Sequence, residues 1–267
     1  PSEEDQAKML AAVGYKSLND LMVGTVPEKI LLKDELKIDE PMSENDALKK
    51  LKSISKKNKI FRNFIGMGYY NSITPNVILR NILENPGWYT SYTPYQPEVA
   101  QGRLEMLLNF QQLIIDLTGM DIANASLLDE ATAAAEAVGL SQRLDKTNSK
   151  KVFISNNCNP QTIDLIKTRT EPFGLDLIIG DEKKELPKIK EDIICGVLSY
   201  PGTLGDITDP SESISQIHKK KGKAILVCDL LALARLKTPA ELGADIAVGS
   251  AQRFGIPMGY GGPHAAF

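Results

Sequence analysis

The sequence has little histidine, cysteine or tryptophan, with two, three and one of these residues in a chain of 267. No histidine stands at a zinc-ligand spacing from a cysteine, so a structural zinc site is not expected. The cysteines (Cys158, Cys195 and Cys228) are odd in number and far apart, which excludes a disulfide framework and fits a reducing compartment. A Ser-His-Asp triad has no sequence signature here.

An excess of one charge and long apolar runs are also missing. Lysine and arginine number 31 against 34 aspartates and glutamates, a net charge of −3, which gives no electrostatic reason to expect a nucleic acid partner. The longest apolar runs, such as Ala224–Val227, are too short to span a membrane. With 42% hydrophobic and 24% charged residues, the chain is expected to be a soluble protein with a large core.

Residues 1–60 predict a helical arm, and residues 61–267 predict one large domain. Ser2 is a helix N-cap followed by acidic residues, and Gly14 marks the end of that helix. Ser43 caps a further helix whose apolar residues form one stripe, namely Ala47, Leu48, Leu51 and Ile54. We interpret the lysines that follow as a solvated face, with a docking surface for an acidic partner as the alternative.

The stretch Trp88–Glu98 gathers the only tryptophan and three of the eight tyrosines of a chain that is 6% aromatic. Pro94 and Pro97 disfavour the α region for the residues before them, so a stiff, extended backbone is expected. Tyrosines on a rigid loop are typical of sites that hold a polar ligand. A buried connector whose rings fill a gap is the alternative, and the residues alone favour neither.

Helices are predicted on both sides of this stretch. Thr74–Pro75 is an N-cap and first-turn pair for a helix to Glu84, and Pro97 begins a longer helix to Leu117. From residue 150 onward, short β-branched runs alternate with capped helices. The expected strands are 152–154, 177–179, 197–198, 225–227 and 246–248. Continuous apolar strands that alternate with helices predict a mostly parallel sheet covered on both faces.

In a parallel sheet of this kind, ligands bind outside the carboxyl ends of the strands. Asp229 follows the strand 225–227 directly, and a loop at 250–262 follows the strand 246–248. Topology therefore predicts a site between them. The glycines of Gly255–His264 let a backbone approach a ligand or a second subunit closely, with tight packing alone as the alternative.

A further helix N-terminus is expected at Asp129–Glu136, where a capping acid precedes a threonine and small residues. Free N–H groups and the positive end of the helix dipole favour an anion at such a place. Asp129 and Glu130, however, bring negative charge to the position that a phosphate would occupy. This conflict argues against a phosphate there.

Several long motifs of the chain closely resemble the P-protein family of the glycine cleavage system, which comprises pyridoxal-phosphate-dependent glycine decarboxylases. The matching stretches are Ile65–Asn71, Tyr92–Glu98, Asn124–Glu130 and Gln252–His264. The resemblance covers nearly the whole chain in order. It implies the front part of the family's N-terminal half, ending before the small domain of that half.

The resemblance implies an α/β fold, the aspartate-aminotransferase-like fold type I, with residues 61–267 as an incomplete large domain. Its cofactor needs a lysine for a Schiff base and an acid against the pyridine nitrogen. Asp229 matches the place of the acid, whereas Gln252 stands at the place of the lysine. The resemblance thus implies a degenerate cofactor site, made of Asp129, Thr132, Asp229, Gln252 and His264, with pyridoxal phosphate bound by the catalytic half instead.

The activity implied is the decarboxylation of glycine, with transfer of the remaining aminomethyl group to the lipoyl arm of H-protein. This segment is expected to be inactive alone and to line the active site of a catalytic partner. The expected lining residues are Tyr92, Thr93, Tyr95, Gln96, Glu98, Asn124 and Ser126. The partners implied are a catalytic C-terminal half or a second P-protein subunit, in a dimer of such paired units, together with H-protein and glycine.

Other interpretations stay open. The segment is alternatively a structural or regulatory half that only stabilises the dimer. It is otherwise part of another fold type I enzyme with its own site, which the missing lysine at position 252 opposes. The compartment follows only from the family: the cytoplasm for a bacterial member and the mitochondrial matrix for a eukaryotic one.

Overall fold

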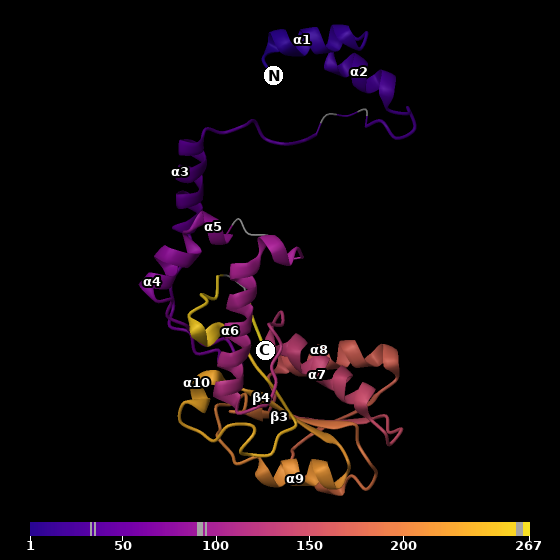
Figure 1. Cartoon of the computed structure of the whole chain (residues 1–267), viewed down its shortest axis with the longest axis vertical. Coiled ribbons are helices and arrows are strands. Elements are labelled where there is room, and N and C mark those ends of the chain that lie inside the picture. Colours follow the sequence, from indigo (N-terminus) through magenta and orange to yellow (C-terminus); the bar gives the residue numbers. More distant parts are fainter. Residues whose placement is uncertain (33, 35, 90–92, 94, 260–263) are drawn as a thin grey trace. The chain divides into compact units, whose positions relative to one another are not determined.

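The computed structural model describes residues 1–32, 34, 36–89, 93, 95–259 and 264–267 (Figure 1). The chain divides into two compact units, Pro1–Phe61 and Arg62–Phe267. Within the described residues, no helix combines the length and the apolar character that a membrane crossing requires.

Short, capped helices make up the unit Pro1–Phe61. They are α1 (Glu3–Ala12), α2 (Leu18–Thr25) and α3 (Glu44–Ser55). Ser2 forms a capping box with Asp5, and Ser17 and Ser43 each accept a hydrogen bond from the backbone N–H three residues on. The predicted caps are confirmed. The apolar stripe of α3 stays exposed, with Leu51 at 63%, so this stripe contributes nothing to a core within the unit.

A five-stranded parallel sheet forms the centre of the unit Arg62–Phe267 (Figure 1). The strands are β1 (Lys151–Ser155), β2 (Asp176–Gly180), β3 (Cys195–Tyr200), β4 (Lys223–Cys228) and β5 (Ile246–Val248). Their order across the sheet is β2-β1-β3-β4-β5, and every neighbouring pair is parallel. The predicted strands and their direction are therefore confirmed.

Helices cover both faces of this sheet. One face packs against α7 (Glu130–Leu144) and α8 (Pro160–Thr170). The other packs against α6 (Gln101–Thr118), α9 (Ser211–Lys219) and α10 (Leu230–Leu233). Successive side chains of a strand point to opposite faces, so Phe153 enters the α6–α9 core while Val152 and Ile154 enter the α7–α8 core.

The described part of 62–100 differs from the prediction. It contains α4 (Asn76–Ile78), a π-helical turn (Leu79–Leu83), α5 (Pro86–Tyr89) and a 3-10 turn (Pro97–Val99). Thr74 does not cap a helix, because its hydroxyl donates to the carbonyl of Gly255 at 2.5 Å, and α4 starts after Pro75 instead. The helix predicted from Pro97 is broken at Ala100, whose φ of −120° and ψ of 17° leave the helical region.

The last residues of the chain close the sheet beside β5. Phe267 and Gly249 exchange both backbone hydrogen bonds, at 3.1 and 3.3 Å, and Ala266 and Leu127 do the same at 2.9 and 2.7 Å. Both pairings are antiparallel in direction. Gly249 fits here because it lacks a side chain: a Cβ would lie 2.2 Å from the carbonyl oxygen of Cys228. A glycine at position 249 therefore lets the ends of β4 and β5 approach closely.

Candidate functional site

An ion pair joins the two loops that the topology predicted to meet. Asp229 follows β4, and Arg253 lies in a short 3-10 turn (Gln252–Phe254) after β5. Arg253 Nε and Nη2 donate to Asp229 Oδ1 and Oδ2 at 3.0 and 2.8 Å. Only 21% and 19% of these side chains are exposed. A bidentate, charge-assisted pair that is largely shielded from water is among the stronger polar contacts in proteins.

The same arginine contacts a segment that is distant in sequence. The carbon at the centre of its guanidinium lies 4.5 Å from the centroid of the Tyr70 ring, a cation–π contact. Next to it, the hydroxyl of Ser72 donates to the carbonyl of Ile256 at 2.5 Å. Gly255 has a φ of +110°, and a Cβ there would lie 2.7 Å from Pro75 Cδ. The backbone of this turn therefore lies directly against residues 70–75.

The start of α7 carries its own negative charge. Asp129 caps the helix by accepting the N–H of Thr132 at 2.7 Å. Glu130 Oε1 accepts from Asn159 Nδ2 at 2.9 Å and from the Thr162 hydroxyl at 3.4 Å. Removal from water raises the pKa of Glu130, and these hydrogen bonds do not compensate fully. The anion-attracting end of the helix is thus occupied by carboxyl groups of the chain itself.

Two cavities adjoin these groups. The smaller, of about 30 Å³, is bordered by Gly68, Glu130, Asp229, Gln252 and Arg253 among others. The larger, of about 280 Å³, is bordered among others by Asp129, Glu130, Gln161, Thr162, Gln252 and His264. No lysine or arginine stands among the described residues that line the larger cavity. Gln252 borders both cavities, is 8% exposed, and its Nε2 has no hydrogen-bond partner among the described residues.

The structure brings several of the predicted degenerate-site residues together. Asp229 and Gln252 border the smaller cavity, and Asp129, Gln252 and His264 border the larger one. Thr132 contributes its N–H to the cap of α7. Arg253 and Tyr70 were not predicted as site residues. The available signals were their places in the motifs Gln252–His264 and Ile65–Asn71, and the adjacency of Arg253 to Gln252.

The predicted lining residues lie elsewhere. Thr93, Tyr95, Gln96 and Glu98 are exposed, and none of them borders the two cavities described above. Asn124 and Ser126 are also exposed, and Asn124 borders a separate, mainly apolar cavity of about 420 Å³ beside β5. Tyr92 lies outside the described residues. The described part of Trp88–Glu98 is at most half-buried, so a connector buried in the core is not what these residues form.

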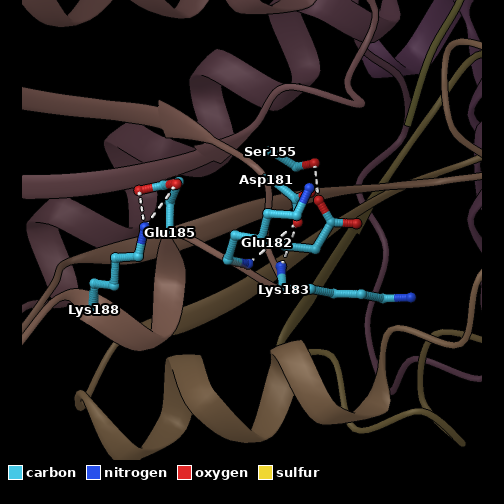
Figure 2. A network of polar contacts seen from close by, with 7 residues as sticks. Ser155, Asp181, Glu182, Lys183, Glu185 and Lys188 are labelled. Atoms are coloured by element: carbon cyan, nitrogen blue, oxygen red, sulfur yellow. Dashed lines mark hydrogen bonds and ion pairs between the residues drawn. The ribbon is translucent and has the colours of Figure 1, made fainter.

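A further polar network lies where β1 and β2 end (Figure 2). The Ser155 hydroxyl donates to Glu182 Oε2 at 2.5 Å, and Asp181 Oδ1 accepts the N–H of Lys183 at 2.8 Å. Lys188 Nζ pairs with Glu185 Oε1 at 3.1 Å (Figure 2). Carboxylates in this network are satisfied by neighbours in the chain, so we read it as loop structure rather than as a ligand site.

Comparison with known proteins places these features in context. The family model for the glycine cleavage system P-protein matches residues 1–267. Glycine dehydrogenase (decarboxylating) of Pelagibacter ubique is 76% identical over 100% of this chain, and that of Photobacterium profundum is 54% identical over 100% of it. The chain spans only 28% of the length of each of these curated relatives.

Solved structures agree with these matches. A crystal structure of glycine decarboxylase (P-protein) of the glycine cleavage system, in inhibitor-bound form, superposes with a TM-score of 0.87 at 34% identity, covering 100% of this chain and 61% of that one. The cystine C-S lyase C-DES, in complex with its product cysteine persulfide, superposes with a TM-score of 0.53 at 13% identity, over 76% of this chain and 56% of that one. The second likeness shows the fold alone, and together they confirm the predicted fold class.

Proposed function

Because this chain belongs to the glycine cleavage system P-protein family, we propose that it is a component of a glycine decarboxylase that shapes an active site without carrying the reactive group. The chain covers only part of its relatives, so the reaction is a property of the larger protein. In that reaction, glycine is decarboxylated and its aminomethyl group passes to the lipoyl arm of H-protein. Pyridoxal phosphate supplies the electron sink for such chemistry when it is bound.

The residues of this chain do not fit pyridoxal phosphate. A Schiff base needs an amine, and Gln252 offers an amide. The carboxylate of Asp229, which would face the pyridine nitrogen, is already bound at both oxygens by Arg253. The cavity beside them is about 30 Å³, whereas a cavity that holds a benzene ring measures roughly 150 Å³. The adjoining larger cavity has Asp129 and Glu130 on its wall, which disfavours a phosphate.

The Arg253–Asp229 pair is the single observation that carries this proposal. The guanidinium neutralises Asp229 and binds both of its oxygens, and Oδ1 also accepts the N–H of Leu231 at 3.1 Å, so a ring nitrogen would have to compete with donors that already occupy this carboxylate. The cofactor is therefore bound by a catalytic half or a second P-protein subunit, with this chain alongside it in a dimer of paired units. Residues 61–267 are then an incomplete large domain with a degenerate cofactor site. In a bacterial member this enzyme works in the cytoplasm, and in a eukaryotic one it works in the mitochondrial matrix.

We assign the walls of the partner's pocket to the stretch Trp88–Glu98, with Asn124 and Ser126. Support comes from exposure: Tyr95 is 76% exposed, and a rigid aromatic side chain at the surface is typical of a contact with a ligand or a partner. A tyrosine hydroxyl in a pocket from which water is excluded can orient the carboxylate of glycine. Thr93, Gln96 and Glu98 are exposed beside it.

The test is a substitution in the complete enzyme. Tyr95→Phe removes one hydroxyl and keeps the ring, so we expect a lower rate of glycine decarboxylation with unchanged stability. Tyr15→Phe, in the unit Pro1–Phe61, is the matched control and should leave the rate unchanged. A Tyr95→Phe enzyme with the rate of the wild type would remove Tyr95 from the pocket and favour the alternative, a half that only stabilises the dimer.

A second measurement addresses the cofactor directly. Pyridoxal phosphate is added to the enzyme, borohydride fixes any imine, and the labelled peptides are identified by mass spectrometry. We expect stoichiometric label on one lysine of the catalytic half, and at residues 1–267 no more than the scattered label that exposed lysines take up. Stoichiometric label on one residue of this chain would overturn the proposal.

A further inference from the structure

We propose that Arg253 converts the cofactor-like site into a clasp, by which we mean a fixed attachment of the segment Gly66–Pro75 to the carboxyl edge of β4 and β5. The guanidinium of Arg253 makes two different contacts at once. Its edge binds both oxygens of Asp229, at 3.0 and 2.8 Å, and its face lies over the ring of Tyr70 at 4.5 Å. A loop, a strand end and a distant segment are thus joined through one side chain.

The contact suits arginine and not lysine. A planar guanidinium presents parallel N–H groups to a carboxylate while its face stays free to stack on an aromatic ring. An ammonium is a compact charge that cannot do both. Without Arg253, the carboxylate of Asp229, which is 19% exposed, would be left largely shielded from water and, among the described residues, with the N–H of Leu231 as a partner but no cation. The arginine therefore stabilises the acid that the degenerate site retains.

The segment Gly66–Pro75 depends on this attachment because it has little apolar anchorage. Ile73 is 89% exposed and Tyr69 is 43% exposed. Its other described attachments are polar: Gln161 Nε2 donates to the carbonyl of Met67 at 2.6 Å, and the hydroxyls of Ser72 and Thr74 donate to carbonyls of the turn after Arg253. The last two reach Gly255 and Ile256, directly after the turn Gln252–Phe254 that contains Arg253, so all three side chains attach the segment at one place.

The clasp deepens the proposed function, because it rests on the statement that no cofactor competes with Arg253 for Asp229. The segment leads into α4 and then into Trp88–Glu98, the stretch assigned to the partner's pocket. Arg253 is in this view a positioning residue: it touches neither substrate nor cofactor and fixes the base from which that stretch extends.

Hydrogen–deuterium exchange in the complete enzyme tests the clasp. In Arg253→Ala, we expect the protected amides of 66–75, among them that of Tyr69, which donates to the Gly66 carbonyl at 3.0 Å, to exchange roughly tenfold to a hundredfold faster, the range that corresponds to losing hydrogen bonds to a charged group. The amides of β1 should be unchanged. Arg235→Ala, which removes an exposed arginine, is the control and should leave 66–75 unchanged.

Conservative replacement separates the shape of the side chain from its charge. Arg253→Lys should behave like Arg253→Ala, and full restoration by lysine would overturn the claim. Unchanged exchange at 66–75 in Arg253→Ala would overturn it as well. If Arg253→Ala fails to fold, Tyr70→Leu replaces the exposed ring alone and should accelerate exchange about twofold to fivefold; no change there would be equally decisive.

The borohydride experiment keeps the two proposals apart. Stoichiometric label on one residue within 1–267 of the unaltered enzyme would end the proposed function, and the exchange of 66–75 in the Arg253 variants would still decide whether the clasp exists. A chain without stoichiometric label together with unchanged exchange would retain the proposed function and end the clasp.

Discussion

A methyl group at Gly249, in the substitution Gly249→Ala, should destabilise the fold next to the site. An added Cβ would lie 2.2 Å from the Cys228 carbonyl oxygen and 2.8 Å from Phe267 Cζ. The oxygen belongs to β4, whose residues are paired with β3 as far as Tyr200–Cys228, so it cannot move without disturbing that ladder. Overpacking of a core costs about 1–3 kcal/mol, here at the upper end. Alanine also lowers the conformational entropy of the unfolded chain, which stabilises the folded state by about 0.4–1 kcal/mol. The net loss expected for Gly249→Ala is therefore about 2 kcal/mol.

Urea denaturation followed by circular dichroism measures this loss. With a denaturant slope of about 1–3 kcal/mol per molar urea, the midpoint should fall by roughly 1 M. Gly102→Ala is the control, because Gly102 lies in α6 and an added Cβ there has no atom within 4 Å. Alanine in a helix should stabilise the chain by about 0.5–1 kcal/mol. Equal midpoints for the two variants would refute the steric argument, since only the contacts at Gly249 distinguish them.

Two further predictions concern groups that are shielded from water. Removal from water raises the pKa of Glu130 in the folded chain, so the chain loses stability as the pH rises from the ordinary value of 4.5 through the raised pKa. Glu130→Gln, which keeps an acceptor for Asn159, should raise the free energy of unfolding at neutral pH and leave it unchanged below pH 4.5. A lower free energy of unfolding at neutral pH, measured by urea denaturation, would contradict this. Burial raises the pKa of Cys195 to about 12 and also raises the pKa values of Cys158 and Cys228. The native protein should therefore not react with Ellman's reagent, and all three thiols should react in denaturant. Rapid labelling of the native protein would show that the thiols are accessible.

Sequence reasoning was sufficient where a local pattern decides the structure. The cap at Ser43 and the strands at 152–154 and 225–227 follow from hydroxyl placement and from uninterrupted β-branched runs, which need no knowledge of distant residues. The carboxyl-edge rule, which depends on topology, also predicted that Asp229 and the loop after β5 meet. The absence of an amine at Gln252 is read directly from the sequence.

Distant contacts explain what sequence reasoning missed. Thr74 has the residue type of an N-cap, but its hydroxyl donates to the carbonyl of Gly255. No residue near Thr74 in the sequence predicts that partner. Arg253 was passed over because a side chain that neutralises Asp229 is recognised only once β4 and β5 are adjacent. Ala100 interrupts a helix that its neighbours favour, and the described contacts offer no physical account of that break.

The order of the strands has a consequence for synthesis on the ribosome. After β1, every strand joins an edge that the existing sheet already offers: β2 and β3 flank β1, β4 extends β3, and β5 extends β4. The sheet can accordingly grow while the polypeptide emerges, without threading a late strand between earlier ones. The pairing of Ala266 with Leu127, like the contacts of residues 70–74 with the turn after β5, joins residues made before β1 to residues made after β5. A nascent polypeptide that stalls before Ala265 would hold β5 as a bare edge, the kind of surface on which chains associate wrongly.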